Sequence, residues 1–252
     1  ISGFVIHELN FDRHHADYDR IYRVGTAAII HGRVTNYAVS PVAMGDALAE
    51  EIPEVESACW FMYDGKPVFA IENEIHNKED AFIVSNNFLK IFTFDFIHGT
   101  SEALDDPYTV VLTESTARKF FAKTDPIGEI IDMGGAELEV SGVIKDLPAS
   151  SHLQFDVLIA WDTYDINPGW DNINAYTYVK LQKDAQIQDA VSKIQTTLID
   201  HREEMELGRE HWMGQEISIS PIVEPLSDIH LGAYLDEDVA FKRKKTNVYI
   251  LM

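Results

Sequence analysis

The sequence predicts an α+β fold. Short runs typical of β-strands alternate irregularly with amphipathic helical runs, and no repeat unit recurs along the 252 residues. Hydrophobic residues make up 46% of the chain and aromatic residues 11%, which is typical of a folded protein with a substantial core. The order of the runs and the composition therefore indicate the same class.

The first part of the chain predicts a β-hairpin followed by a helix. Residues 20–30 and 33–40 are strand-like and flank His31-Gly32, which we expect to form the turn. Ser40-Pro41 predicts a helix start, with serine as the N-cap and proline at the first helical position. The apolar positions that we expect to face the core from this helix are Met44, Leu48 and Ile52.

The next segment predicts three strands, a short helix and an aromatic core. The strand-like runs are residues 55–63, 68–75 and 81–84, and a short helix is expected around residues 86–92. Four phenylalanines crowd this region: Phe88, Phe92, Phe94 and Phe96. Such clusters are usually core, so we expect ring packing rather than a ligand cage.

The middle of the chain predicts a strand, a helix and two further strands. Residues 109–112 are strand-like, and Thr113-Glu114-Ser115 predicts the cap of a helix that runs to Phe121. Residues 129–133 and 138–144 are expected to be strands.

The stretch Val140–Leu153, VSGVIKDLPASSHL, predicts a strand, a fixed turn and a second apolar run that opens at His152. Gly142 indicates a bulge or a close backbone approach. Asp146, Pro148 and the Ser150-Ser151 pair interrupt the strand, because proline cannot donate to a ladder and the other side chains capture backbone groups. We interpret this stretch as structural rather than as a catalytic loop.

The last third predicts a strand, a long helix and a final strand. Residues 175–181 alternate as a strand, Asp184 is expected to cap a helix, and residues 217–223 form the last strand. The apolar stripe of the helix consists of Ile187, Val191, Ile194 and Leu198. Loop-like seams near residues 103 and 169 divide the chain.

The net charge of −22 makes nucleic-acid binding an unlikely main activity, because the chain repels phosphate backbones. Cys59 is the one cysteine, so the chain has neither an intrachain disulfide nor a thiolate-rich metal site, and its apolar neighbours indicate a buried thiol. The absence of disulfides fits the cytosol and the periplasm alike.

Catalytic and metal motifs have no positive support in this sequence. His7-Glu8 begins like a zinc-protease motif, but Phe11 stands where its second histidine would be. His7, Asp12, His14 and His15 are the one grouping that could gather around a metal, and a solvated polar stalk is the expected alternative. P-loop, dinucleotide and nucleophile-elbow motifs are absent, so we expect neither a cofactor nor enzymatic activity.

Both ends of the sequence resemble stubs of longer hydrophobic helices. ISGFVIHEL opens without methionine, and Asn247–Met252, NVYILM, is almost entirely apolar. Lys242–Lys245, the one basic run, precedes that stub and suggests side chains at a membrane surface, with an ordinary charged helix as the alternative. We expect a fragment that lies between two membrane spans.

Nine motifs occur in an order that resembles the MacB-like periplasmic core domain of FtsX-like ABC transporter permeases. They are ELNFD (8–12), DRIYRV (19–24), PEV (53–55), FLKIFTFDFIHG (88–99), VVLTESTARKFF (110–121), DPIG (125–128), SGVIKDLPASSHL (141–153), TYVKL (177–181) and DIHL (228–231). Each motif is weak alone, whereas the ordered set covers nearly the whole chain. One departure is Phe121-Ala122, where family members often carry Phe-Gly.

The resemblance implies an extracytoplasmic domain of an inner-membrane permease, between its first and second transmembrane helices, that couples cytoplasmic ATP hydrolysis to efflux, lipoprotein release or mechanotransmission. It implies a porter-like α/β subdomain, residues 1–102 and 170–252, with an inserted, smaller, mostly-β sabre-like subdomain at residues 103–169. Residues 7–20 and 238–252 would be the stalks.

The resemblance also implies partners: a cytoplasmic ABC ATPase, fused or separate, a second permease copy, and a periplasmic adaptor, outer-membrane or envelope protein. The signature residues expected to hold the fold and the stalks are Asp12, Tyr22, Arg23, Pro126, Gly128, Asp146, Pro148, Ser151 and His152. A stand-alone periplasmic ligand-binding module and a metallo-hydrolase are the alternatives.

Overall fold

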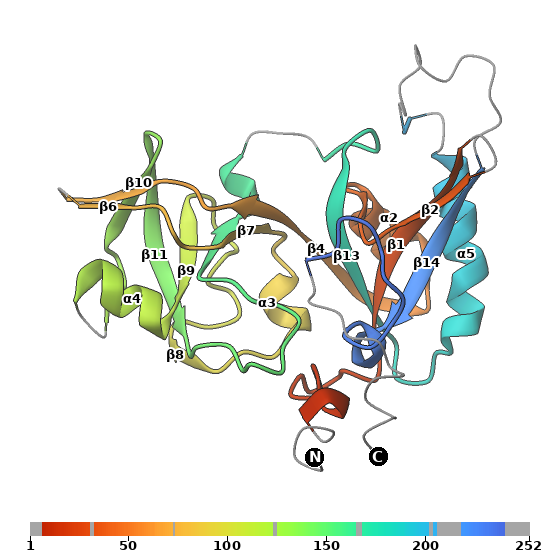
Figure 1. The fold of residues 1–252 in the computed structure, drawn as a ribbon, viewed down its shortest axis with the longest axis horizontal. Coiled ribbons are helices and arrows are strands. Elements are labelled where there is room, and N and C mark those ends of the chain that lie inside the picture. Colours follow the sequence, from red (N-terminus) through yellow and green to blue (C-terminus); the bar gives the residue numbers. More distant parts are fainter. Residues whose placement is uncertain are drawn as a thin grey trace. The chain divides into compact units, whose positions relative to one another are not determined.

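The computed structural model describes residues 7–30, 33–72, 74–122, 125–164, 168–201, 204–205 and 218–239. The chain forms two compact units, which Figure 1 shows. Unit 1 comprises Ile1–Trp60 and Asn167–Met252, and unit 2 comprises Phe61–Ile166. Unit 2 thus begins at residue 61, whereas the predicted insertion begins at residue 103; the match of these units to porter-like and sabre-like parts stays a prediction.

Unit 1 is built on an antiparallel sheet centred on β1, Ile21–Ile30. β1 pairs with β14, Ser218–Pro225, on one side; on the other it pairs first with β13, Ile173–Leu181, and then with β2, Arg33–Tyr37. The order continues from β13 to β4, Val55–Gly65, whose first half belongs to this unit. The predicted hairpin is confirmed; its turn, His31-Gly32, lies outside the described residues.

Two helices pack against one face of this sheet. They are α2, Met44–Glu51, and α5, Ile187–Asp200. Their buried side chains form one core with Val24 of β1 and Val179 of β13. Met44, Leu48 and Ile52 are buried in this core as predicted.

Two expected helix starts in unit 1 are wrong. Ser40-Pro41 forms the short strand β3, which pairs with β13, and α2 begins only at Met44. The Ser40 hydroxyl donates to Thr177 Oγ1 at 2.8 Å, so a tertiary hydrogen bond replaces the expected cap. α5 begins at Ile187 with Gln186, not Asp184, at the N-cap position, and Val191 of the predicted stripe is exposed.

Unit 2 is a mixed sheet in the order β4-β7-β12-β9-β11-β10-β5-β6, with β8 also on β11. Its strands are β5 (Phe69–Ile71), β6 (Glu74–His76), β7 (Ala81–Val84), β8 (Phe96–His98), β9 (Thr109–Thr113), β10 (Ile130–Met133), β11 (Ala136–Ile144) and β12 (Val157–Ala160). The register of β11 on β9 shifts between Val140 and Gly142, which confirms the predicted irregularity there.

Two short helices belong to unit 2: α3, Phe88–Ile91, and α4, Glu114–Phe121. Short 3₁₀ turns occur at Trp161–Thr163 here and at Leu226–Asp228 in unit 1. Phe88 and Phe92 are buried with ring centroids 5.1 Å apart, as expected of a core cluster. Thr113 is the N-cap residue of α4, as predicted, and the helix ends at Ala122 in the left-handed region, φ 50° and ψ 23°.

The α+β class predicted from the sequence is confirmed. Within the described ranges, no helix combines the length and the apolar character that crossing a membrane would require.

Candidate functional site

The candidate site of unit 1 lies on the sheet face opposite α2 and α5. Val24 and Val179 point toward the helices, so the strand alternation turns their neighbours Arg23 and Tyr178 toward the other face. Arg23 and Tyr178 are paired across β1 and β13. Both are buried, and Arg23 is only 1% exposed. The sheet face opposite α2 and α5 is therefore also shielded from solvent at these two residues.

Arg23 is the buried cation of this face. Its Nη2 lies 2.6 Å from Glu224 Oε2, and its two terminal nitrogens lie 2.8 and 3.0 Å from the two carboxylate oxygens of Asp238. Burial acts to lower the pKa of Arg23, but neighbouring Tyr178, Asp238 and Glu224 raise it above its ordinary value. A charged guanidinium thus joins β1 to β14 and to the segment that follows β14.

Two tyrosines of β13 line the same face. Burial raises the pKa of Tyr178 well above its usual value; Arg23 acts to lower it, whereas Asp238 and Asp12 raise it further. Tyr176 donates its hydroxyl to the carbonyl of Glu237 at 2.5 Å, and burial raises the pKa of Tyr176 to about 12. Both phenols are neutral at physiological pH, so they act as hydrogen-bonding core residues rather than as bases.

The two ends of the described chain meet at what we call the end clasp, formed by Glu8, Phe11 and His230. Glu8 Oε2 lies 2.9 Å from His230 Nε2, and both side chains are buried. The Phe11 ring stacks on the His230 ring, with centroids 3.5 Å apart and an interplanar angle of 3°. The clasp therefore joins residues that are 222 positions apart in sequence.

Burial of the N-terminal segment corrects one expectation. We expected a solvated polar stalk, but Glu8, Phe11, Asp12 and His15 are all buried. The stretch is thus partly buried, since His7, Asn10, Arg13 and His14 remain exposed. In the part of the chain that the structure describes, no group of three or more His, Cys, Asp or Glu side chains could hold a metal ion.

An ionic group of four residues fixes the segment that leads into β1. Arg20 contacts Asp17 and Glu56 at 2.8 and 2.6 Å, and Lys180 contacts Glu56 at 2.7 Å. The hydrogen bond from Arg20, followed by that from Lys180, lowers the pKa of Asp17. Lys180 and then Arg20 lower the pKa of Glu56. These ion pairs tie residues 17–20 to β4 and β13.

Six of the nine predicted signature residues lie in unit 2. Asp146 Oδ1 accepts a hydrogen bond from the Ser115 amide at 2.9 Å, at the start of α4. The Ser151 amide donates to the Pro148 carbonyl at 3.0 Å, which closes the predicted turn. His152 is buried edge-on to Phe92 at 6.4 Å. The expected second strand begins only at Val157, because residues 152–156 form an irregular segment with bends at both ends.

The DPIG turn carries the remaining two signature residues of unit 2. Pro126 is buried, and the Gly128 amide donates to the Val140 carbonyl at 2.9 Å. Gly128 has a φ of +80°, a conformation that a residue with a Cβ adopts only with strain. Both residues therefore shape the entry to β10.

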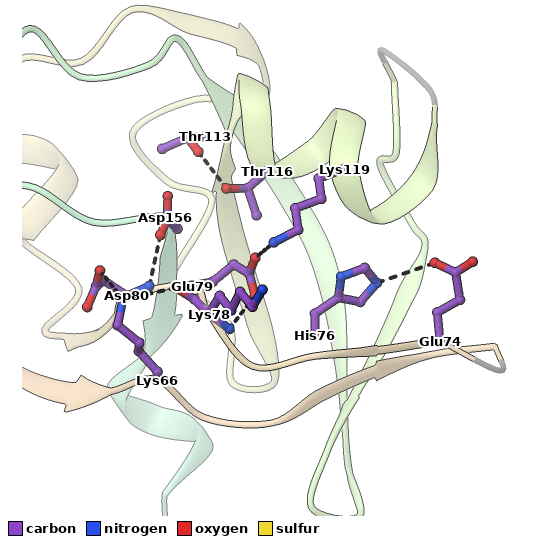
Figure 2. Close-up of polar contacts among 10 residues, drawn as sticks. All are labelled: Lys66, Glu74, His76, Lys78, Glu79, Asp80, Thr113, Thr116, Lys119 and Asp156. Atoms are coloured by element: carbon purple, nitrogen blue, oxygen red, sulfur yellow. Dashed lines mark hydrogen bonds and ion pairs between the residues drawn. The ribbon is translucent and has the colours of Figure 1, made fainter.

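A buried carboxylate missed by sequence reasoning fixes α4 to the sheet of unit 2 (Figure 2). Glu79 forms an ion pair with Lys119 of α4 and accepts a hydrogen bond from the Lys78 amide at 3.0 Å. Burial acts to raise the pKa of Glu79, but Lys119 and the Lys78 amide outweigh it and lower the pKa. The neighbouring Asp80 amide donates to Asp156 at 2.8 Å. Nothing in the local sequence separates Glu79 from a surface glutamate.

The nine signature residues are thus divided between the two units. Asp12 and Arg23 belong to the buried face of unit 1, whereas Tyr22 lies partly buried on the helix side of the same strand. Cys59 is fully buried, and burial raises the pKa of its thiol well above the usual value, so it is protonated and shielded at neutral pH. The polar groups of these sites are engaged in holding segments together.

Comparison with known proteins identifies a matching family. The family model for the MacB-like periplasmic core domain matches residues 1–197. No curated protein sequence matches the chain.

Three solved structures share the fold. A domain assigned to a permease protein of Porphyromonas gingivalis has a TM-score of 0.66 at 19% identity, covering 94% of this chain and 99% of that one. The periplasmic region of MacB from Actinobacillus actinomycetemcomitans has a TM-score of 0.56 at 14% identity, covering 79% and 87%. The extracellular domain of the noncanonic ABC-type transporter YknZ from Gram-positive bacteria has a TM-score of 0.52 at 15% identity, covering 73% and 90%.

Proposed function

The chain belongs to the family of MacB-like periplasmic core domains of ABC transporter permeases, and we propose that it couples ATP hydrolysis in the cytoplasm to mechanical work outside the inner membrane. In this proposal it lies between the first and second transmembrane helices of the permease. Unit 1 is the porter-like part, and unit 2 is the inserted sabre-like part. The work delivered is efflux, lipoprotein release or control of an envelope protein.

The observation that carries the proposal is the connection of both chain ends to one sheet. Glu8 and Phe11, near one end, hold His230, near the other, in the end clasp. Asp238 is tied to β1 through Arg23. A displacement applied near residues 8–11 therefore reaches the segment that follows β14, and one applied at Asp238 reaches β1. Residues 240–252, which would complete the second stalk, lie outside the described residues.

The same reasoning assigns structural roles to the signature residues. In this proposal Asp146 holds the start of α4 and His152 packs in the aromatic core. We expect His152→Ala to lower thermal stability together with transport. A variant that kept its melting temperature but lost transport would contradict this role.

The partners follow from the proposal. A permease of this class needs a cytoplasmic ABC ATPase, fused or separate, and a second permease copy in the membrane. An affinity pull-down of the full-length parent from its native membranes tests this, with co-purified proteins identified by mass spectrometry. Recovery of a P-loop ATPase, or a P-loop within the parent chain, would support the transporter assignment. A soluble parent without an ATPase would favour a stand-alone ligand-binding module.

A second experiment tests the coupling itself. The parent protein is reconstituted with its ATPase, and hydrogen exchange of β1 and β14 is compared with and without ATP. We expect His230→Ala to leave basal ATP hydrolysis intact but to reduce the ATP-dependent change in exchange by at least half. Lys193→Met is the matched control. Lys193 lies on α5, and this variant removes its exposed ion pair with Glu54. An unchanged response in His230→Ala would refute coupling through the end clasp.

A further inference from the structure

The strands β11, β10, β5 and β6 of unit 2 present one face that α4 covers and one that it does not. Phe120 of α4 packs on Phe69 and His76, with ring centroids 5.8 and 4.5 Å away. Ile131 and Leu138, which are paired across β10 and β11, are buried on the same side. Strand alternation places the intervening residues on the opposite side. We call that side the outer face.

The outer face carries exposed apolar side chains. Ile75 is 71% exposed, Val68 52% and Ile130 46%. The register places Ile75 beside Ala70 and Ala70 beside Asp132, so these residues form one row across three strands. Ile130 and Val68 lie in the rows on either side of this one, so the three large apolar side chains share one sheet face, a feature of interaction surfaces.

The same face carries several carboxylates. Asp132 stands directly opposite Glu137, and Ile130 stands opposite Glu139. Like charges that face each other across two strands destabilise a sheet. The cations Lys66 and Lys119 are engaged elsewhere, with Asp80 and Glu79 (Figure 2). Among the described residues, no Lys or Arg forms an ion pair with Asp132, Glu137 or Glu139.

We propose that the outer face is a docking surface for a basic polypeptide that also carries apolar side chains. Apolar contacts with Val68, Ile75 and Ile130 would supply burial, and lysine or arginine of the partner would relieve the repulsion between Asp132 and Glu137. The partner committed to here is a separate polypeptide, because this chain is strongly acidic overall, with a net charge of −22. This inference concerns unit 2 alone and does not depend on coupling through the end clasp.

The test uses the 252-residue chain with isotope-labelled Ile and Val methyl groups and three synthetic probes. The probes are octapeptides of alternating Lys-Val, Lys-Ser and Glu-Val. We expect Lys-Val to shift the methyl signals of Ile75, Ile130 and Val68 but not that of Ile199, which is similarly exposed at 43% but lies on α5 of unit 1. The Lys-Ser probe should bind about tenfold more weakly, because it lacks apolar side chains, and Glu-Val should not bind.

Charge reversal supplies the specificity control. Glu137→Lys with Glu139→Lys should weaken Lys-Val binding by about tenfold, since two attractive contacts become repulsive. Glu50→Lys with Asp200→Lys makes the same change in net charge at exposed helix ends of unit 1 and should leave the affinity unchanged. Glu137→Gln removes the like-charge pair without loss of stability, so weaker binding by that variant cannot result from unfolding.

Four results would overturn the proposal. They are shifts spread over the acidic surface of both units, equal binding of Lys-Ser and Lys-Val, equal weakening by the two charge-reversed variants, and the absence of shifts at millimolar Lys-Val. Shifts confined to the outer face that depend on Glu137 and Glu139 would support it.

Discussion

Replacement of Arg23 by methionine is the sharpest test of the buried face of unit 1. Methionine keeps much of the side-chain volume but leaves the carboxylates of Glu224 and Asp238 without their cation. Removal of one partner from a buried ion pair typically destabilises a protein by about 3–5 kcal/mol. Arg23 contacts two carboxylates, so we expect the upper half of that range. A domain of this size has a total stability of about 5–15 kcal/mol.

The assay is urea unfolding followed by circular dichroism at pH 7, with thermal unfolding as a second measure. A loss of about 4 kcal/mol corresponds to a decrease in Tm of roughly 8–16 °C for a chain of this length. Lys193→Met is the matched control, because the ion pair between Lys193 and Glu54 is exposed and should contribute less than about 1 kcal/mol. Arg23→Lys, which keeps the charge but loses the two-pronged contact with Asp238, should lie between the two variants.

A loss below about 1 kcal/mol in Arg23→Met would refute the reasoning, since the carboxylates would then have to be hydrated or protonated at no penalty. The double variant Arg23→Met with Asp238→Asn gives an independent check. It should recover part of the stability, because the second substitution removes one of the uncompensated charges. If Arg23→Met proves too unstable to purify, the free energies of unfolding of Arg23→Lys and Lys193→Met are compared instead. Arg23→Lys should then lose more stability than Lys193→Met.

Three further predictions concern other parts of the chain. Ala122→Gly should stabilise unit 2 by about 0.5–1 kcal/mol, because Ala122 has a left-handed conformation that glycine adopts without strain; a lower urea midpoint would contradict this. Lys119→Met should cost about 1–3 kcal/mol, since it leaves Glu79 buried without its cation, and an unchanged Tm would show that Glu79 is hydrated. The pKa values of Asp17 and Glu56 are lowered by neighbouring cations, so the stability that these groups contribute is present above about pH 5 and is lost as the pH falls through their folded-state pKa values. The urea midpoint should therefore decrease from pH 5 to pH 3, and a flat profile would exclude this contribution.

Local patterns predicted the elements whose sequence signal is local. The alternation in β1 and β13 and the helical spacing of Met44 and Leu48 depend only on neighbouring residues, and the structure confirms them. Ser40 failed as an N-cap because its hydroxyl bonds to Thr177, 137 residues away. N-cap preferences depend only on residues within about one helical turn, so they cannot predict a hydrogen bond to a distant residue.

The candidate site was less predictable for the same reason. Glu8 and His230 each lie in a motif of the family resemblance, but nothing in either motif indicates that the two side chains meet. The stretch around Asp12 and His15 is rich in polar residues, which favours a solvated interpretation, although tertiary partners bury it. Burial of polar side chains is decided by contacts between distant segments, which composition cannot report.

The shielded thiol of Cys59 has a practical consequence. Because it is the one cysteine of the chain and is fully buried, it should not react with maleimide or methanethiosulfonate reagents in the native state. The wild-type sequence can therefore accept a single added surface cysteine that carries a spin label or fluorophore, without background labelling. A label placed near residue 8 or near residue 230 would then report on the surroundings of the end clasp in this chain.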